Sequence, residues 1–195
     1  MNHLEIRRQV SHILFGITIV ILLQFNYLNG FILFDLILLN LIISLLSKRY
    51  NIPVVTWLLE ALDRTEDIKR FPAKGTLMFL IGVSLVVWMF PKDIALASIL
   101  ILTFGDGVST YVGTHFGRTK LFFNGMKTCE GSLSGFVAAS AGALIFLSVP
   151  QALIASGVAM IVEAFEVKIG KWIVNDNITV PLVAAASIWL FRILF

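Results

Sequence analysis

Residues 93–113 read DIALASILILTFGDGVSTYVG. This run is close to the roughly 20 apolar residues with which an α-helix crosses a bilayer. Near its end lies Asp106, and a carboxylate inside an apolar segment is costly enough to indicate a functional site. Glycines and hydroxyls surround Asp106, and a loop with three cations follows. We therefore expect a phosphate-bearing ligand, held with a metal ion, at a membrane surface.

The rest of the chain is equally apolar, with 58% hydrophobic and 14% charged residues among 195. Backbone groups in hydrocarbon must bond to one another, which favours helices. We predict an all-α fold: a polytopic membrane helical bundle in which residues 1–195 form a single membrane-embedded catalytic domain. About seven transmembrane helices correspond to the apolar runs 10–28, 31–47, 75–90, 93–113, 133–149, 151–167 and 179–195.

The positive charges predict the topology. They lie before the first apolar run and after the second, fourth and sixth, and only Lys92 and Arg192 lie elsewhere. The positive-inside rule then places the N-terminus and the polar connections in the cytoplasm. We expect an integral, multi-pass protein of the cell membrane in a prokaryote, or of the endoplasmic reticulum in a eukaryote. Residues 53–71 predict one amphipathic helix at the cytoplasmic interface, or a plain connector.

Asp106 belongs to a helix face that also carries Thr110, Gly113 and Gly117. Their spacing of four, three and four residues puts them on one side of a helix. Asp106 could hold Mg²⁺, which prefers one or two carboxylates together with phosphate oxygens. The alternative is a helix-packing stripe with a buried, protonated aspartate. The cations that follow favour the functional interpretation.

The loop at residues 117–132 supplies Arg118, Lys120 and Lys127. Gly131 and Ser132 then open the next helix, where free amides favour an anion. Ordinary positive-inside charge would also explain any one of these cations. The acid Glu130, which could cap the helix or bind a second metal, has no such topological use. Small residues in the next helix, Gly131, Gly135 and Gly142, predict close helix packing.

Two more acidic groups lie at the predicted cytoplasmic side. Glu163 and Glu166 are neighbours on a helix and suit metal binding or proton transfer, or else balance nearby lysines. The run Asn175-Asp176-Asn177 suits a helix cap or oxygen ligation of a hard cation.

At the mouth of the first run lie Arg8 and His12, and the histidine could be a base, a phosphate contact or an interfacial side chain. The predicted topology therefore brings eight residues to one end of the bundle. They are Arg8, His12, Asp106, Arg118, Lys127, Glu130, Glu163 and Asp176.

Over nearly its whole length the chain resembles the integral-membrane CTP-dependent lipid kinases: dolichol kinase, phytol kinase and the CTP-using diacylglycerol kinases. The motifs are Glu5-x-x-Arg8-x-x-x-His12-x-x-x-Gly16, Phe71-Pro72-x-Lys74-Gly75, Gly105-Asp106 through Lys120, Lys127-Thr128-x-Glu130-Gly131-Ser132-x-x-Gly135-Phe136, Glu163, and Asp176-Asn177-x-Thr179-x-Pro181-Leu182. Two departures are Ala73, where we expect glycine, and Asn175, often a second aspartate.

The resemblance implies transfer of the terminal phosphate of CTP to the hydroxyl of a membrane lipid alcohol, with a polyprenol or dolichol as first choice and a diacylglycerol-type lipid as second. It implies Mg²⁺ or another divalent cation as cofactor. The implied partners are CTP, the lipid alcohol and the bilayer, without nucleic acid. The alternative is a CTP-dependent cytidylyltransferase acting on a lipid phosphate, and a transporter is the non-enzymatic rival.

Site roles follow from the same resemblance. The implied catalytic residues are Asp106, Glu163, Asp176 and His12, of which Asp106, Asp176 and Glu163 would hold the metal. The implied CTP-binding residues are Arg8, Thr110, Gly113, Gly117, Arg118, Lys120, Lys127, Thr128, Glu130, Gly131, Ser132 and Asn177.

Overall fold

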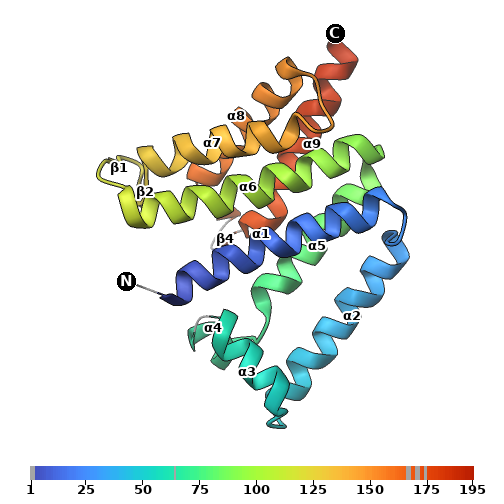
Figure 1. The fold of residues 1–195 in the computed structure, drawn as a ribbon, viewed down its shortest axis with the longest axis vertical. Coiled ribbons are helices and arrows are strands. Elements are labelled where there is room, and N and C mark those ends of the chain that lie inside the picture. Colours follow the sequence, from blue (N-terminus) through green and yellow to red (C-terminus); the bar gives the residue numbers. More distant parts are fainter. Residues whose placement is uncertain (1–2, 64, 166–167, 170–171, 174) are drawn as a thin grey trace.

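The computed structural model describes residues 3–63, 65–165, 168–169, 172–173 and 175–195, and it is a helical bundle (Figure 1). Its helices are α1 (His3–Gln24), α2 (Gly30–Ser47), α3 (Pro53–Leu62), α4 (Thr65–Arg70), α5 (Lys74–Met89), α6 (Lys92–Phe116), α7 (Cys129–Ala143), α8 (Val149–Phe165) and α9 (Asp176–Leu194). Each predicted apolar run overlaps one of α1, α2 and α5–α9, so the all-α prediction is confirmed.

The protein is an integral membrane protein. Within the described ranges, α1 from Leu4, α2, α6 and α9 are long and apolar enough to cross a bilayer. The helices α5 and α8 are apolar but shorter. A short helix can be accommodated by local thinning of the bilayer or by its flanking residues. The count of seven spans stays a prediction.

Helix α6 forms the centre of the bundle. Every residue from Ile94 to Thr103 is buried, as expected of a helix that is apolar all round. It packs along α7 and also contacts α1 and α9 (Figure 1). Because α6 is enclosed on several sides, its polar end around Asp106 is fixed relative to the neighbouring helices.

The close contact between α6 and α7 depends on glycine residues, which have no side chain. A Cβ atom on Gly131 would lie 2.7 Å from the Ser109 carbonyl oxygen, and one on Gly135 would lie 2.8 Å from that of Gly105. At Gly142 a Cβ would meet the ring of Phe104 at 2.5 Å. Such distances leave no room for a methyl group, so the predicted close packing of this helix is confirmed.

The two ends of the bundle differ. The N-terminus and the β1–β2 hairpin lie at one end, and the α1–α2 and α5–α6 connections lie at the other, with the C-terminus (Figure 1). At that second end Lys92 donates to the Gln24 carbonyl and the Asn26 side chain, each at 2.8 Å. Arg192 pairs with Asp93 at 2.6 Å. The only two cations expected on the outer side therefore hold the connections and the last helix together.

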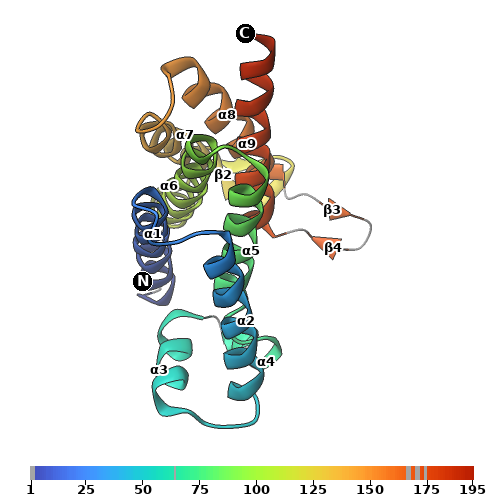
Figure 2. The ribbon, with the colours of Figure 1, turned by 90° about the vertical axis from the view of Figure 1, so that its right-hand side faces the viewer.

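The segment 53–71 differs from its prediction. It forms two helices, α3 and α4, because the backbone of Asp63 is extended (φ −100°, ψ 155°) and its carboxylate accepts a hydrogen bond from the Ala73 amide at 2.6 Å. The amphipathic character itself is present, since Val54, Trp57 and Leu58 are exposed while Leu59 is buried. Figure 2 shows α3 and α4 at the opposite end of the molecule from the C-terminus.

Two β-hairpins also occur where we expected loops. The first pairs β1 (Lys120–Leu121) with β2 (Asn124–Thr128), and the second pairs β3 (Lys168–Ile169) with β4 (Trp172–Ile173). Strands this short carry no recognisable alternation. In the first hairpin Lys120 lies opposite Thr128, which fixes where the residues just before α7 lie.

Candidate active site

A cavity of about 500 Å³ lies where α1, α6, β2, α7 and α9 meet. Its lining consists of Glu5, Arg8, Gln9, Asp106, Ser109, Thr110, Gly113, Thr114, Met126, Lys127, Thr128, Gly131, Ser132, Asn175, Asp176 and Asn177. Five elements from distant parts of the sequence therefore contribute to one polar cavity. Arg8 and Lys127 are its cations among the described residues.

The start of α7 supplies the part of this cavity that is best suited to an anion. Thr128 is the N-cap, and its hydroxyl accepts a hydrogen bond from the Gly131 amide at 3.2 Å. A Cβ on Gly131 would lie 3.0 Å from the Gly113 Cα, so the two backbones meet at the cavity wall. The positive end of the helix dipole and the first-turn amides attract negative charge.

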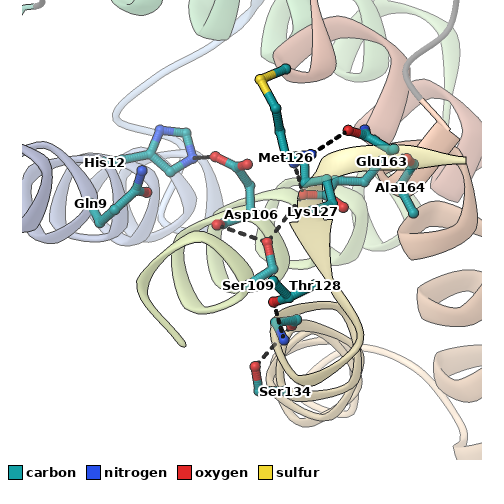
Figure 3. A network of polar contacts seen from close by, with 12 residues as sticks. Gln9, His12, Asp106, Ser109, Met126, Lys127, Thr128, Ser134, Glu163 and Ala164 are labelled. Atoms are coloured by element: carbon teal, nitrogen blue, oxygen red, sulfur yellow. Dashed lines mark hydrogen bonds and ion pairs between the residues drawn. The ribbon is translucent and has the colours of Figure 1, made fainter. Parts of the chain in front are cut away.

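The Lys127 side chain is paired with a buried carboxylate (Figure 3). Its ammonium forms an ion pair with Glu163, which has no exposed surface and also accepts a hydrogen bond from the Ser109 hydroxyl at 3.1 Å. Burial alone would lower the pKa of Lys127, but Glu163 and then Asp106 outweigh it, and the pKa is raised. The side chain is therefore a permanent cation at the cavity wall.

Asp106 lies between Lys127 and His12 (Figure 3). The His12 Nε2 atom is 4.0 Å from the Asp106 Oδ2 atom, and both side chains are mostly buried. The histidine ring packs edge-on against Phe79 with 5.2 Å between ring centroids. Among the described residues, its Nε2 atom has no hydrogen-bond partner.

The three residues of the predicted Asn-Asp-Asn run have different roles. Asn175 caps α9 by accepting the Asn177 amide at 3.0 Å. Asp176 and Asn177 line the cavity, and the Asn177 side chain donates to the Gly75 carbonyl at 3.3 Å. The run is therefore both a helix cap and part of the cavity wall.

Many of the predicted site residues gather at the cavity. Those that line it are Arg8, Asp106, Thr110, Gly113, Lys127, Thr128, Gly131, Ser132, Asp176 and Asn177. His12 adjoins Asp106, and Glu163 lies behind Lys127. The predicted neighbour Glu166 lies outside the described residues.

Four predicted CTP-binding residues do not line the cavity. Arg118 and Lys120 are exposed. The carboxylate of Glu130 instead accepts hydrogen bonds from the Thr119 amide at 3.1 and 3.2 Å. Gly117 packs against its own helix, where a Cβ would lie 2.3 Å from the Gly113 carbonyl oxygen. These four residues therefore do not form part of the cavity lining.

Several lining residues were not predicted as site residues. The most informative are Gln9, Ser109 and Glu5, the last of which was quoted only as part of a motif. Glu5 pairs with Arg8 at 2.6 Å and receives a hydrogen bond from Gln9 at 2.9 Å. Their spacing of three and four residues along one helix was an available signal. Ser109 likewise follows Asp106 by three residues, so it shares the same helix face.

The lining also limits how a metal ion could bind. Among the described residues, no three histidine, cysteine, aspartate or glutamate side chains lie close enough together to form a metal centre by themselves. Asp106 and Asp176 line the same cavity, however. Two carboxylates fit Mg²⁺, which completes its shell with water and substrate phosphates. Glu163 is already committed to Lys127.

Together these features define an all-α integral membrane protein with a phosphate-suited cavity at one end of the bundle. Comparison with known proteins identifies its relatives. The chain is 31% identical to an uncharacterised protein of Methanocaldococcus jannaschii, over 93% of this chain and 91% of that protein. It is 30% identical to the phytol kinase of Synechocystis, over 71% of this chain and 63% of the kinase.

A third relative is the CTP-dependent diacylglycerol kinase 1 of Schizosaccharomyces pombe, 26% identical over 60% of this chain and 59% of the kinase. These two kinase relatives are members of the CTP-dependent lipid kinase family. The chain spans about 60% of the length of these two kinases. No family model and no solved structure matches the chain.

Proposed function

We propose that the protein is a lipid kinase that transfers the terminal phosphate of CTP to the hydroxyl of a membrane lipid alcohol. The observation that carries the proposal is that Asp106, Lys127 and the start of α7 share one cavity. Phosphoryl transfer is mostly positioning and charge neutralisation, and these three features supply both.

The cavity suits a nucleoside triphosphate, which carries about four negative charges that must be neutralised. Lys127 is a fixed cation because it is paired with Glu163, which is itself held by a hydrogen bond from Ser109. The amides of Gly131 and Ser132 belong to the first turn of α7, where an anion is favoured. Arg8 lies on the α1 side of the cavity, paired with Glu5.

Asp106 and Asp176 are the residues that would hold a divalent cation, and Mg²⁺ is the ion that two carboxylates and a triphosphate favour. When bound, such an ion would neutralise charge on the phosphate oxygens. We assign Glu163 a different role from the metal binding expected from the sequence. It has no exposed surface and keeps Lys127 charged and oriented.

The transfer forms a bond between the lipid oxygen and the γ-phosphorus. It breaks the bond from that phosphorus to the bridging oxygen, so that CDP leaves. The hydroxyl proton departs through the His12–Asp106 pair, whose atoms lie 4.0 Å apart beside the cavity. A polyprenol or dolichol, phytol and a diacylglycerol are the acceptors to compare, since the relatives' names specify phytol and diacylglycerol kinases.

Labelled CTP tests the proposal. Purified protein in mixed micelles would receive each lipid alcohol with γ-labelled or α-labelled CTP, or with ATP. We expect the γ-label on the lipid, whereas the α-label would appear there if the enzyme were a cytidylyltransferase. Asp106→Asn is expected to abolish turnover while the variant still inserts and keeps its melting temperature. Full activity of that variant would refute the assignment of Asp106.

A further inference from the structure

A second cavity, of about 390 Å³, adjoins the first. Arg8, Gln9, Asp106 and Asn177 line both cavities, so these residues form a shared wall. Anything bound in the second cavity therefore lies next to Asp106, on the side away from Lys127. This is the position that a second substrate of the same reaction must occupy.

Part of the remaining wall of the second cavity is apolar. Phe15 of α1 and Phe79 of α5 pack with 5.4 Å between ring centroids, and Leu62 closes the α3 side. Phe15 is 36% exposed, which places an apolar surface at the edge of the cavity. Such an aromatic and aliphatic part of the wall suits the hydrocarbon next to a lipid head group.

The polar groups of this cavity suit a hydroxyl. The His12 Nε2 and Asp106 Oδ2 atoms are 4.0 Å apart, too far for a direct hydrogen bond. One oxygen atom can nevertheless lie within about 2.8 Å of both. The His12 Nε2 atom is buried and has no hydrogen-bond partner among the described residues. Buried polar groups normally have a partner, and a bound hydroxyl would provide one.

The charges of the cavity discriminate between classes of lipid. Asp63, Asp67 and Asp106 line it, whereas Arg8 is the cation among the described lining residues and is already paired with Glu5. Burial raises the pKa of Asp63 and nearby Asp67 adds to this, which together outweigh the opposing effects of the Ala73 amide and of Arg8. The site therefore already disfavours further negative charge. A lipid phosphate would be repelled, but an uncharged alcohol would not.

We infer that the second cavity is the acceptor subsite and that it selects a neutral lipid alcohol, whose hydroxyl lies between His12 and Asp106. The inference rests on the proposed function and adds the place of the acceptor and the residues that would disfavour a charged lipid. It also gives a physical reason why a lipid phosphate, the substrate of a cytidylyltransferase, is the poorer ligand.

Gly75 allows a clean test. It lines the second cavity but not the first, and a Cβ placed there meets nothing within 4 Å. Gly75→Leu and Gly75→Phe therefore start from open space beside the second cavity and add bulk there, in the first turn of a helix that tolerates them. We expect the apparent KM for the lipid alcohol to rise about tenfold or more. The Kd for CTP should stay within about twofold, because the first cavity is untouched.

Gly125→Phe is the matched control, since Gly125 is equally open but lies outside both cavities. Its KM for the lipid should equal that of the wild type. An unchanged lipid KM in both Gly75 variants, or an equal rise in the KM for CTP, would overturn the subsite. Absence of phosphate transfer to every alcohol by the wild-type protein would instead overturn the proposed function.

The charge selection has its own test. The lipid monophosphate should inhibit the wild-type enzyme weakly, and Asp67→Asn should strengthen that inhibition at least threefold, about what one lost like charge contributes. Equal inhibition of both proteins would contradict the selection of a neutral acceptor.

Discussion

The two cavities share a wall and differ in almost everything else. The first has Lys127, the start of α7 and the bare backbone at Gly113 and Gly131. The second has two phenylalanine rings and carboxylates. The first cavity therefore offers a phosphate a restrained cation and a helix start, which the second cavity lacks, and Asp106 lies between them. An anionic donor and an uncharged acceptor can thus approach one carboxylate from opposite sides without competing for the same place.

Replacing Lys127 should have the largest effect on the difference between the two cavities. Lys127→Met removes the restrained cation, and we expect kcat/KM for CTP to fall on the order of 100-fold or more. It also leaves Glu163 buried without its partner, which typically costs about 3–5 kcal/mol. Steady-state kinetics and thermal unfolding in detergent measure the two effects separately.

The double variant Lys127→Met, Glu163→Gln distinguishes folding from binding. Gln removes the stranded charge, so most of the stability should return while the activity does not. Lys120→Met is the control, because Lys120 is exposed and outside the cavity, and its kinetics should match the wild type. If Lys127→Met bound CTP normally, the first cavity would not be the phosphate site.

A second variant tests whether the α6–α7 contact supports only the first cavity. Gly135→Val places a side chain 2.8 Å from the Gly105 carbonyl oxygen and 2.7 Å from the Ser109 Cβ. Forced overpacking typically costs about 1–3 kcal/mol. Separation of α6 from α7 should weaken CTP binding more than it weakens lipid binding.

Equilibrium binding of CTP and the KM for the alcohol provide the two readouts. Gly157→Ala is a suitable control, because its Cβ would make an ordinary contact of 3.7 Å with Phe136. A larger loss on the lipid side than on the CTP side would show that the two cavities are not separable in this way.

The sequence predicted the helices well because hydrophobicity alone determines where they lie. The seven apolar runs each overlap a helix, and Asp106 stands at the polar end of the central one. Which of the three cations lies in the cavity and which are exposed could not be predicted. Arg118, Lys120 and Lys127 are equivalent as positive-inside charges, and only the pairing of β1 with β2 sends Lys127 toward Glu163 while Lys120 stays exposed.

The role of Glu163 also depended on tertiary structure. Its position in an apolar helix resembles that of Asp106, so both were predicted as metal ligands. Burial separates them, since Glu163 has no exposed surface and Asp106 remains partly accessible in two cavities. The break between α3 and α4 was equally hidden, because it comes from a hydrogen bond between Asp63 and Ala73, ten residues later.

The smallest expected effect concerns that hydrogen bond, which shapes the mouth of the second cavity. Ala73 has a left-handed backbone (φ 56°, ψ 26°) at the N-cap of α5. An alanine there costs about 1–2 kcal/mol, which glycine avoids. Ala73→Gly should therefore stabilise the protein by about 1 kcal/mol, after the entropy cost of glycine is subtracted. Its melting temperature should rise by about 2–4 °C.

Kinetics should not change in this variant, because the Ala73 amide still donates to Asp63 and no side chain that lines either cavity is altered. Ala73→Val is the opposing control and should lower the melting temperature, since a β-branched residue is least tolerant of positive φ. A lower melting temperature for Ala73→Gly would mean that this turn is not strained. A changed lipid KM at constant CTP affinity would instead show that the turn controls access to the second cavity alone.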